Sequence, residues 1–260
     1  MTGTVSLQTS GSLARVTLSN PGKFNAMSRA MWLELRSVFT HIQQSSSIRC
    51  VLVSGEAGHF CSGGDISEYA GFRFAENSLR DFHENEVWGG LQAMLDCDVP
   101  IVAQIAGNCM GAGLEISSCC DLRIAAESSR FGAPIAKLGF PMAPREAALV
   151  SQAAGALTAR EMLLSAAILD APQMLRRGFL NSVAADADLV ASVQAQVERI
   201  VSLAPLAARL NKQTFRTLGQ SAQHSVSTEL VAGAYAYADT PEHREGIAAF
   251  IEKRPARFVS

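Results

Sequence analysis

The sequence has no excess of charge of either sign. Its 260 residues include 22 lysines and arginines and 24 aspartates and glutamates, which gives a formal net charge of −2. A chain so close to neutral carries no electrostatic signal for a nucleic acid or for an anionic membrane surface. Any ligand that carries phosphate must therefore be held by a few individually placed lysines or arginines.

Signals for export, membrane insertion and metal binding are also missing. The longest uncharged apolar-leaning run, 99–114, is short for a membrane span and is interrupted by glycines. The N-terminus lacks the basic and then apolar pattern of a signal peptide, which predicts a cytoplasmic protein. The six cysteines form no CxxC pair and no metal-ligand spacing. We therefore expect reduced, structural cysteines and no metal site.

The first half of the chain alternates strand and helix patterns. Apolar segments at 13–18, 50–53, 99–105 and 122–125 are typical of strands, and the spacing of apolar residues over 29–43 predicts a helix. A hairpin is expected to join 5–7 to 13–18. This alternation predicts an α/β fold.

The second half is dominated by helical patterns after a proline- and glycine-rich loop at 131–144. The segments predicted to be helical are 146–154, 158–166, 171–178, 187–203, 206–218, 226–237 and 241–253. The organisation expected from both halves is an α/β core over residues 1–200, which holds the ligand site, and a helical region over residues 201–260.

Residues 107–121 are the strongest candidate for a reactive site. Gly107, Gly111 and Gly113 follow a strand pattern, and a helical pattern begins near Ala112. A helix start presents unpaired N–H groups and the positive end of the helix dipole, which suits an anion. Glu115 lies in the first turn of this helix, on the same face as Ala112.

A second glycine turn, 58–65, follows the strand at 50–53. If the two strands are joined by a normal parallel crossover, both turns lie at the same edge of the sheet. Backbone N–H groups from the two turns would then form an oxyanion hole for an enolate or a tetrahedral thioester intermediate. The alternative is structural, because glycines also serve tight packing and the dipole stabilises any first-turn glutamate.

Several segments resemble the crotonase (enoyl-CoA hydratase/isomerase) superfamily in order and spacing. They are 20–27 (Asn-Pro-Gly-Lys-Phe-Asn-Ala-Met), 60–66 (Phe-Cys-Ser-Gly-Gly-Asp-Ile), 107–121, 131–134 (Phe-Gly-Ala-Pro) and 245–254. The resemblance implies a crotonase-like stack of ββα turns with a helical C-terminal trimerisation region. It also implies an acyl-CoA thioester substrate, no separate cofactor, and a homotrimer or a dimer of trimers.

The resemblance further implies roles for individual residues. The oxyanion amides would be those of Gly64 and Ala112, and Glu115 would be the catalytic carboxylate. Ser62 would lie near the adenine of coenzyme A. Lys23 and Lys253 would lie near its phosphates, the latter across a subunit boundary. The other residues expected in the substrate site are Gly63, Asp65, Ile66, Gly111 and Ile135. Asp65 is interpreted as a turn or helix cap rather than a base.

The sequence departs from the family where hydratases carry a second glutamate, because that position is Ile135 here. The glycine-rich loop that follows is replaced by 141–146 (Pro-Met-Ala-Pro-Arg-Glu). Hydration or double-bond isomerisation of an enoyl-CoA is the default expectation, and decarboxylation, C–C cleavage or thioester hydrolysis are alternatives. A crotonase-like protein that binds acyl-CoA without turnover is a further alternative.

Other charged residues near these segments are weaker candidates. Lys137 and Arg145 lie in the altered loop, and His83, Glu84 and Glu86 lie on a segment expected to cover the pocket. For each of them a solvated surface position is the simpler interpretation.

Overall fold

The computed structural model describes residues 2–222 and 228–258. Its main sheet has six strands in the order β1-β2-β3-β4-β6-β9. Their bounds are Thr4–Ser10, Leu13–Ser19, Cys50–Gly55, Ile101–Ile105, Leu122–Ala126 and Ser182–Ala184. β1 and β2 form the predicted antiparallel hairpin, and every other pairing in this sheet is parallel.

Both faces of the central strands are buried, which explains their nearly continuous apolar sequences. On one face, Val51, Val53 and Ile101 join the largest apolar cluster, to which helices α1 (Arg29–Gln44) and α3 (Trp88–Asp96) contribute. On the other face, Leu52 and Val102 pack with helix α8 (Leu189–Ser202). The α/β layering expected from the sequence is therefore confirmed.

A second sheet of three short strands was not expected. It contains β5 (Asn108–Met110), β7 (Arg130–Gly132) and β8 (Ile168–Asp170). The prediction of a loop over 131–144 was wrong, because this segment contains the end of β7, the 3-10 helix η3 (Ile135–Leu138) and the start of helix α5 (Pro144–Ala154). Strands of three residues are too short to show alternation, and only their pairing across the chain defines them.

The predicted helices are present with modest shifts at their ends. Ser28 caps α1, since its hydroxyl accepts a hydrogen bond from the Met31 N–H at 3.3 Å. Residues 66–87 are divided into the 3-10 helix η1 (Ile66–Gly71), α2 (Glu76–Asp81) and the π-helical turn η2 (Phe82–Val87). The remaining helices are α4 (Ala112–Ser118), α6 (Ala156–Ser165), α7 (Ala171–Arg176), η4 (Asp186–Asp188), α9 (Pro205–Ala222), α10 (Thr228–Gly233) and α11 (Pro241–Ile251). The predicted helix 226–237 begins outside the described residues.

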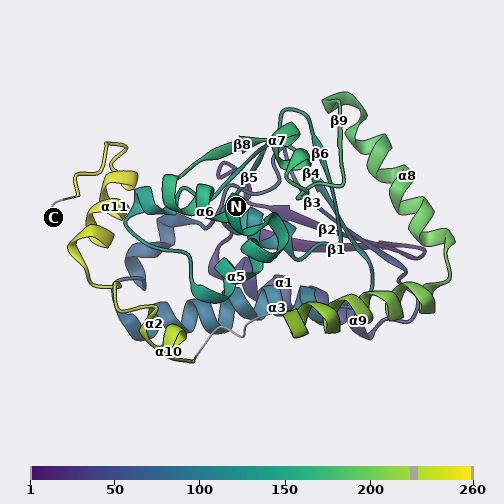
Figure 1. Cartoon of the computed structure of the whole chain (residues 1–260), viewed down its shortest axis with the longest axis horizontal. Helices are drawn as coiled ribbons and strands as arrows, with labels where there is room; N and C mark the ends of the chain where they lie inside the picture. Colours follow the sequence, from purple (N-terminus) through teal and green to yellow (C-terminus); the bar gives the residue numbers. More distant parts are fainter. Residues whose placement is uncertain (1, 223–227, 259–260) are drawn as a thin grey trace.

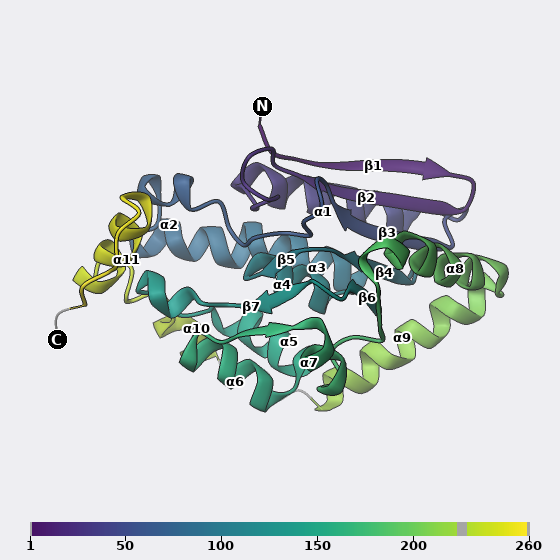
Figure 2. The same ribbon diagram turned by 90° about the horizontal axis from the view of Figure 1, so that it is seen from above.

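The C-terminal helices extend along the whole molecule. Figures 1 and 2 show α8 and α9 at one end and α11 beside α2 at the other. Helix α11 contacts both η1 and η3, the two 3-10 helices that follow the predicted site motifs. The boundary at residue 200 stays a prediction. No helix in the described ranges is long and apolar enough to cross a membrane.

Candidate active site

The two glycine turns lie against each other, as predicted. β3 and β4 are parallel neighbours, and their extensions pair through Cys61. The Cys61 N–H donates to Asn108 O at 2.9 Å, and the Met110 N–H donates to Cys61 O at 2.9 Å. A Cβ added to Gly111 would lie 3.5 Å from Gly63 Cα, so the two backbones are in contact.

The backbone at Gly64 and Ala112 leaves two N–H groups without protein acceptors. The neighbours of Gly64 bond to Met27, through Met27 N to Gly63 O and Asp65 N to Met27 O, both at 2.8 Å. In such a parallel bridge the Gly64 N–H points away from Met27. Ala112 is the first residue of α4, where N–H groups have no intrahelical partner. Within the described part of the chain neither N–H donates to a protein acceptor.

Glu115 follows in the first turn of α4 and is partly buried. Its pKa is raised to about 8, mainly by burial and to a lesser extent by the carboxyl of Glu146, while the Arg73 guanidinium opposes the rise. The helix dipole was expected to lower the pKa of Glu115. Desolvation outweighs that effect, and the carboxyl holds its proton in the neutral pH range.

Glu146 is a second buried carboxyl that the sequence analysis missed. It lies in the first turn of α5, which packs against α4, and only 2% of its surface is exposed. Its pKa is raised to about 8, mainly by burial and to a lesser extent by the nearby Glu84. Glu115 and Glu146 therefore form a coupled pair, in which ionisation of one carboxyl disfavours ionisation of the other.

His83, on η2, holds the side chain of Glu146. Its Nδ1 lies 3.0 Å from Glu146 Oε1, and its Nε2 lies 3.5 Å from Arg73 Nη1. Burial, with a smaller contribution from Arg73, holds the pKa of His83 well below its ordinary value, so the ring is neutral. Since a guanidinium only donates, His83 Nε2 accepts and Nδ1–H donates to Glu146.

Tyr69 brings a hydroxyl to the first oxyanion turn. A Cβ added to Gly64 would lie 2.1 Å from the Tyr69 hydroxyl oxygen. The ring is held by Phe72, Phe82 and Phe140 at centroid distances of 5.9, 6.5 and 6.0 Å. Tyr69 is buried, and its hydroxyl makes no hydrogen bond within the described residues.

Lys23 and Ser62, two of the residues expected to contact coenzyme A, lie close to the glycine turn 58–65. Lys23 Nζ lies 2.6 Å from Asp65 Oδ2 and 2.8 Å from Ser67 Oγ. Ser62 Oγ donates to Lys23 O at 2.8 Å. Asp65 caps η1, and although burial raises its pKa, the hydrogen bonds from Lys23 and Ser67 lower it overall. Ile66 begins η1.

The other predicted residues occupy varied positions. Ile135 begins η3 and packs against the largest apolar cluster. Lys253 is exposed after the end of α11, and its side chain makes no hydrogen bond or ion pair with the described residues. Lys137 is exposed as well. Arg145 pairs with Glu84 at 3.4 Å, while Glu86 pairs with Arg29.

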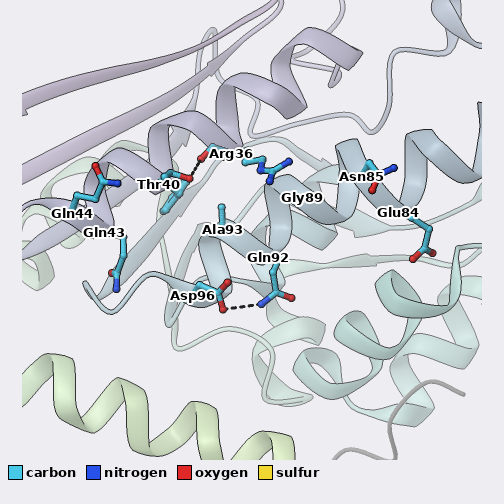
Figure 3. A pocket seen from close by; sticks show the side chains of 11 residues that line it. Arg36, Thr40, Gln43, Gln44, Glu84, Asn85, Gly89, Gln92, Ala93 and Asp96 are labelled. Atoms are coloured by element: carbon cyan, nitrogen blue, oxygen red, sulfur yellow. Dashed lines mark hydrogen bonds between the residues drawn. The ribbon is translucent and has the colours of Figure 1, made fainter. Parts of the chain in front are cut away.

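A surface groove of about 410 Å³ lies apart from these turns, between α1 and α3 (Figure 3). Arg36, Thr40, Gln43 and Gln92 line it. None of the residues predicted for catalysis or substrate binding contributes to this groove, so it is not the predicted site.

Comparisons with known proteins show the family to which the chain is similar. The family described as enoyl-CoA hydratase/isomerase matches residues 8–260. A probable enoyl-CoA hydratase of Mycobacterium bovis is 31% identical and covers 94% of this chain and 93% of its own. The crystal structure of an enoyl-CoA hydratase/carnithine racemase from Magnetospirillum magneticum has 34% identity and a TM-score of 0.81, over 98% of this chain and 95% of its own.

A third similar protein has a different reaction in its name. The crystal structure of a methylmalonyl CoA decarboxylase is 25% identical, with a TM-score of 0.85 over 100% of this chain and 99% of its own. These matches extend over almost the full length of each protein. The family model and the motifs at both glycine turns lead to one assignment, and the chain belongs to the enoyl-CoA hydratase/isomerase family, within the crotonase superfamily.

Proposed function

We propose that this protein hydrates the double bond of a 2-enoyl-CoA thioester, with Glu115 and Glu146 as an acid–base pair. The observation that carries the proposal is the second buried carboxyl, Glu146, which is coupled to Glu115 although the family's usual second glutamate position is Ile135. Hydration needs a base that takes a proton from water and an acid that protonates C2. One proton shared by two carboxyls supplies both.

The hydrogen bonds suggest which carboxyl holds the proton. His83 Nδ1–H donates to Glu146, and a donated hydrogen bond favours the ionised form. The Glu115 carboxyl receives no hydrogen bond from the described residues. We therefore assign the negative charge to Glu146, as the base, and the proton to Glu115, as the acid.

The proposed reaction balances without another reactant. Glu146 takes a proton from water as the water oxygen bonds to C3, and the electron pair of the double bond moves to the thioester oxygen. The N–H groups of Gly64 and Ala112 stabilise the enolate that forms. Glu115 then gives its proton to C2. Transfer of one proton from Glu146 to Glu115 restores the starting state.

Binding of the coenzyme A portion is part of the same proposal. Ser62 and Lys253 would contact its polar groups, and so would Lys23 if it exchanged its ion pair with Asp65 for a phosphate. Gly63, Gly111 and Ile135 would lie along the path to the reacting carbons. The substrate would bring coenzyme A with it, and no further cofactor is proposed. A homotrimer or a dimer of trimers is proposed from the resemblance to the superfamily.

A mass-spectrometric assay with crotonyl-CoA tests the reaction. The wild-type protein should add the mass of one water, and Glu115→Gln and Glu146→Gln should each slow this by about 10²- to 10⁴-fold. Glu127→Gln, an exposed carboxylate at the end of β6, is the matched control. Loss of carbon dioxide from a carboxylated acyl-CoA, or a changed elution time at constant mass, would replace hydration by decarboxylation or isomerisation. Binding without any product would favour a non-catalytic acyl-CoA binder.

A further inference from the structure

Arg73 is a buried cation that the proposed reaction does not use. It lies two residues after the end of η1, between Phe72 and Phe74, and 1% of its surface is exposed. Its guanidinium carbon lies 4.3 Å from the Tyr69 ring centroid and 4.1 Å from that of Phe140. The charge is thus enclosed between two aromatic faces.

The hydrogen bonds of Arg73 are too few for a buried guanidinium. Nη2 donates to the Tyr237 hydroxyl at 3.2 Å, and Nη1 lies 3.5 Å from His83 Nε2. Both partners are neutral, and Nε has no partner at all. No carboxylate of the described residues forms an ion pair with Arg73. A buried guanidinium N–H without an acceptor is unfavourable, so this arrangement leaves a donor free for a further acceptor.

A second unpaired nitrogen marks the same place. His243 Nδ1 is bonded to Ala238 O at 2.9 Å, which leaves the buried Nε2 as an acceptor without a donor. The His243 ring contacts Phe140 at 5.6 Å, on whose face Arg73 also lies. Arg73 Nε and His243 Nε2 are the two buried side-chain nitrogens without a partner in residues 2–222 and 228–258. Of the two, only Arg73 Nε is a donor that can bind a carboxylate, because the neutral His243 Nε2 is itself an acceptor.

This place adjoins the reacting centre. Tyr69, on which the guanidinium is stacked, has its hydroxyl against Gly64, and Arg73 acts electrostatically on both Glu115 and Glu146. The depth of one aromatic side chain separates Arg73 from the first oxyanion turn. An acyl chain bound with its carbonyl at Gly64 would have to be short to end at Arg73.

We propose that Arg73 binds a carboxylate at the far end of the acyl group, so that the preferred substrates are short acyl-CoA thioesters of dicarboxylic acids. Nε and an Nη of one guanidinium form a planar pair of donors that matches the two oxygens of a carboxylate. Nε has no protein partner, and the contact of Nη1 with His83 is long at 3.5 Å, so binding of a carboxylate would break no strong hydrogen bond. The inference rests on the proposed function only in placing the thioester carbonyl at Gly64.

The alternative is that Arg73 has no ligand and only adjusts the protonation of Glu115 and Glu146. The two roles differ in selectivity. An arginine that binds the carboxylate makes the protein discriminate between acyl groups with and without it. An arginine that only sets the protonation of Glu115 and Glu146 affects turnover of both acyl groups equally and changes the pH profile of turnover.

Binding of two unreactive thioesters tests the proposal by calorimetry. Glutaryl-CoA and pentanoyl-CoA have the same chain length and differ in having a carboxylate or a methyl group at the end. The wild-type protein should bind glutaryl-CoA at least tenfold more tightly. Arg73→Gln should remove this preference while pentanoyl-CoA binding changes less than threefold, and Arg176→Gln, at the exposed end of α7, should retain it. A wild-type protein without preference, or an Arg73→Gln protein that keeps it, overturns the proposal.

Turnover separates this inference from the proposed hydration. With glutaconyl-CoA and 2-pentenoyl-CoA, kcat/KM should favour the carboxylated substrate in the wild type and not in Arg73→Gln. If neither is hydrated while the preference for glutaryl-CoA still depends on Arg73, hydration is wrong and the carboxylate site stands. If Arg73→Gln does not fold, Arg73→Lys provides the test of the carboxylate site. A preference for glutaryl-CoA that Arg73→Lys retains supports the site. Equal binding of both thioesters by the wild type and by Arg73→Lys contradicts it.

Discussion

Replacing Glu146 by glutamine should stabilise the fold at alkaline pH and leave it unchanged in acid. Burial raises the pKa of Glu146 from its ordinary value of 4.5 to about 8 in the folded protein. The folded state therefore holds a proton that the unfolded chain releases, and stability falls as the pH rises between these values. Glutamine has the same shape and no charge, so it removes this pH dependence.

The magnitude follows from the size of the pKa difference. A rise from 4.5 to about 8 corresponds to an upper limit of about 5 kcal/mol. The amide oxygen of glutamine still accepts from His83, but that bond loses about 1 kcal/mol because its acceptor is no longer charged. Part of the remainder is shared with Glu115, since the two carboxyls titrate together. We expect a net gain of about 2–4 kcal/mol above pH 8.

Thermal unfolding at pH 5, 7 and 9 measures this gain. For a chain of this size, 2–4 kcal/mol corresponds to a rise in Tm of roughly 5–12 °C at pH 9. The difference should shrink steadily toward pH 5, where less than about 1 kcal/mol remains. The exposed Glu127→Gln serves as the control and should show no such trend. An equal effect of Glu146→Gln at pH 5 and pH 9, or a loss of stability at pH 9, would refute the argument that burial raises the pKa of Glu146.

Two further predictions concern turnover. The pKa of both carboxyls is raised to about 8, and the pair needs one proton for turnover. We therefore expect kcat to fall in acid, as the base is protonated, and to fall again from about pH 8 upward, as the acid loses its proton. A kcat that stays constant up to pH 10 would contradict a carboxyl acid. Gly64→Ala places a Cβ 2.1 Å from the Tyr69 hydroxyl, so it should lower kcat/KM by about 10²-fold with the fold intact. Adding Tyr69→Phe to the same chain should restore part of the loss. If the effects of the two substitutions are simply additive, this contact is not the cause.

Much of the fold and half of the reacting centre could be predicted from the sequence. Buried parallel strands are continuous apolar runs, and the glycine turns can be recognised from their glycine spacing in the sequence. The three-residue strands could not be found, because Phe131 is in a strand only through its partners Cys109 and Leu169. Nothing local in the sequence encodes such pairing.

The sequence analysis missed Glu146 and Arg73 for a related reason. A glutamate in the first turn of a helix is usually a solvated residue that the helix dipole stabilises. Glu146 is buried because α4 and η2 pack against the start of α5, and these segments lie far apart along the chain. The available signal for Arg73 was its position between two phenylalanines, because a charged side chain flanked by large apolar ones is unusual.

A second carboxyl at position 146 instead of position 135 has different hydrogen-bond partners, and these set its protonation. Ile135 packs with apolar side chains, so a glutamate there would have no partner of the kind that His83 provides for Glu146. From Glu146, contacts lead through His83 and Arg73 to the Tyr237 hydroxyl. The proposed base is thus tied to the C-terminal region of the same chain. If a substrate carboxylate takes over Arg73, it also changes the electrostatic environment of both glutamates, so acyl recognition and proton transfer share one set of side chains.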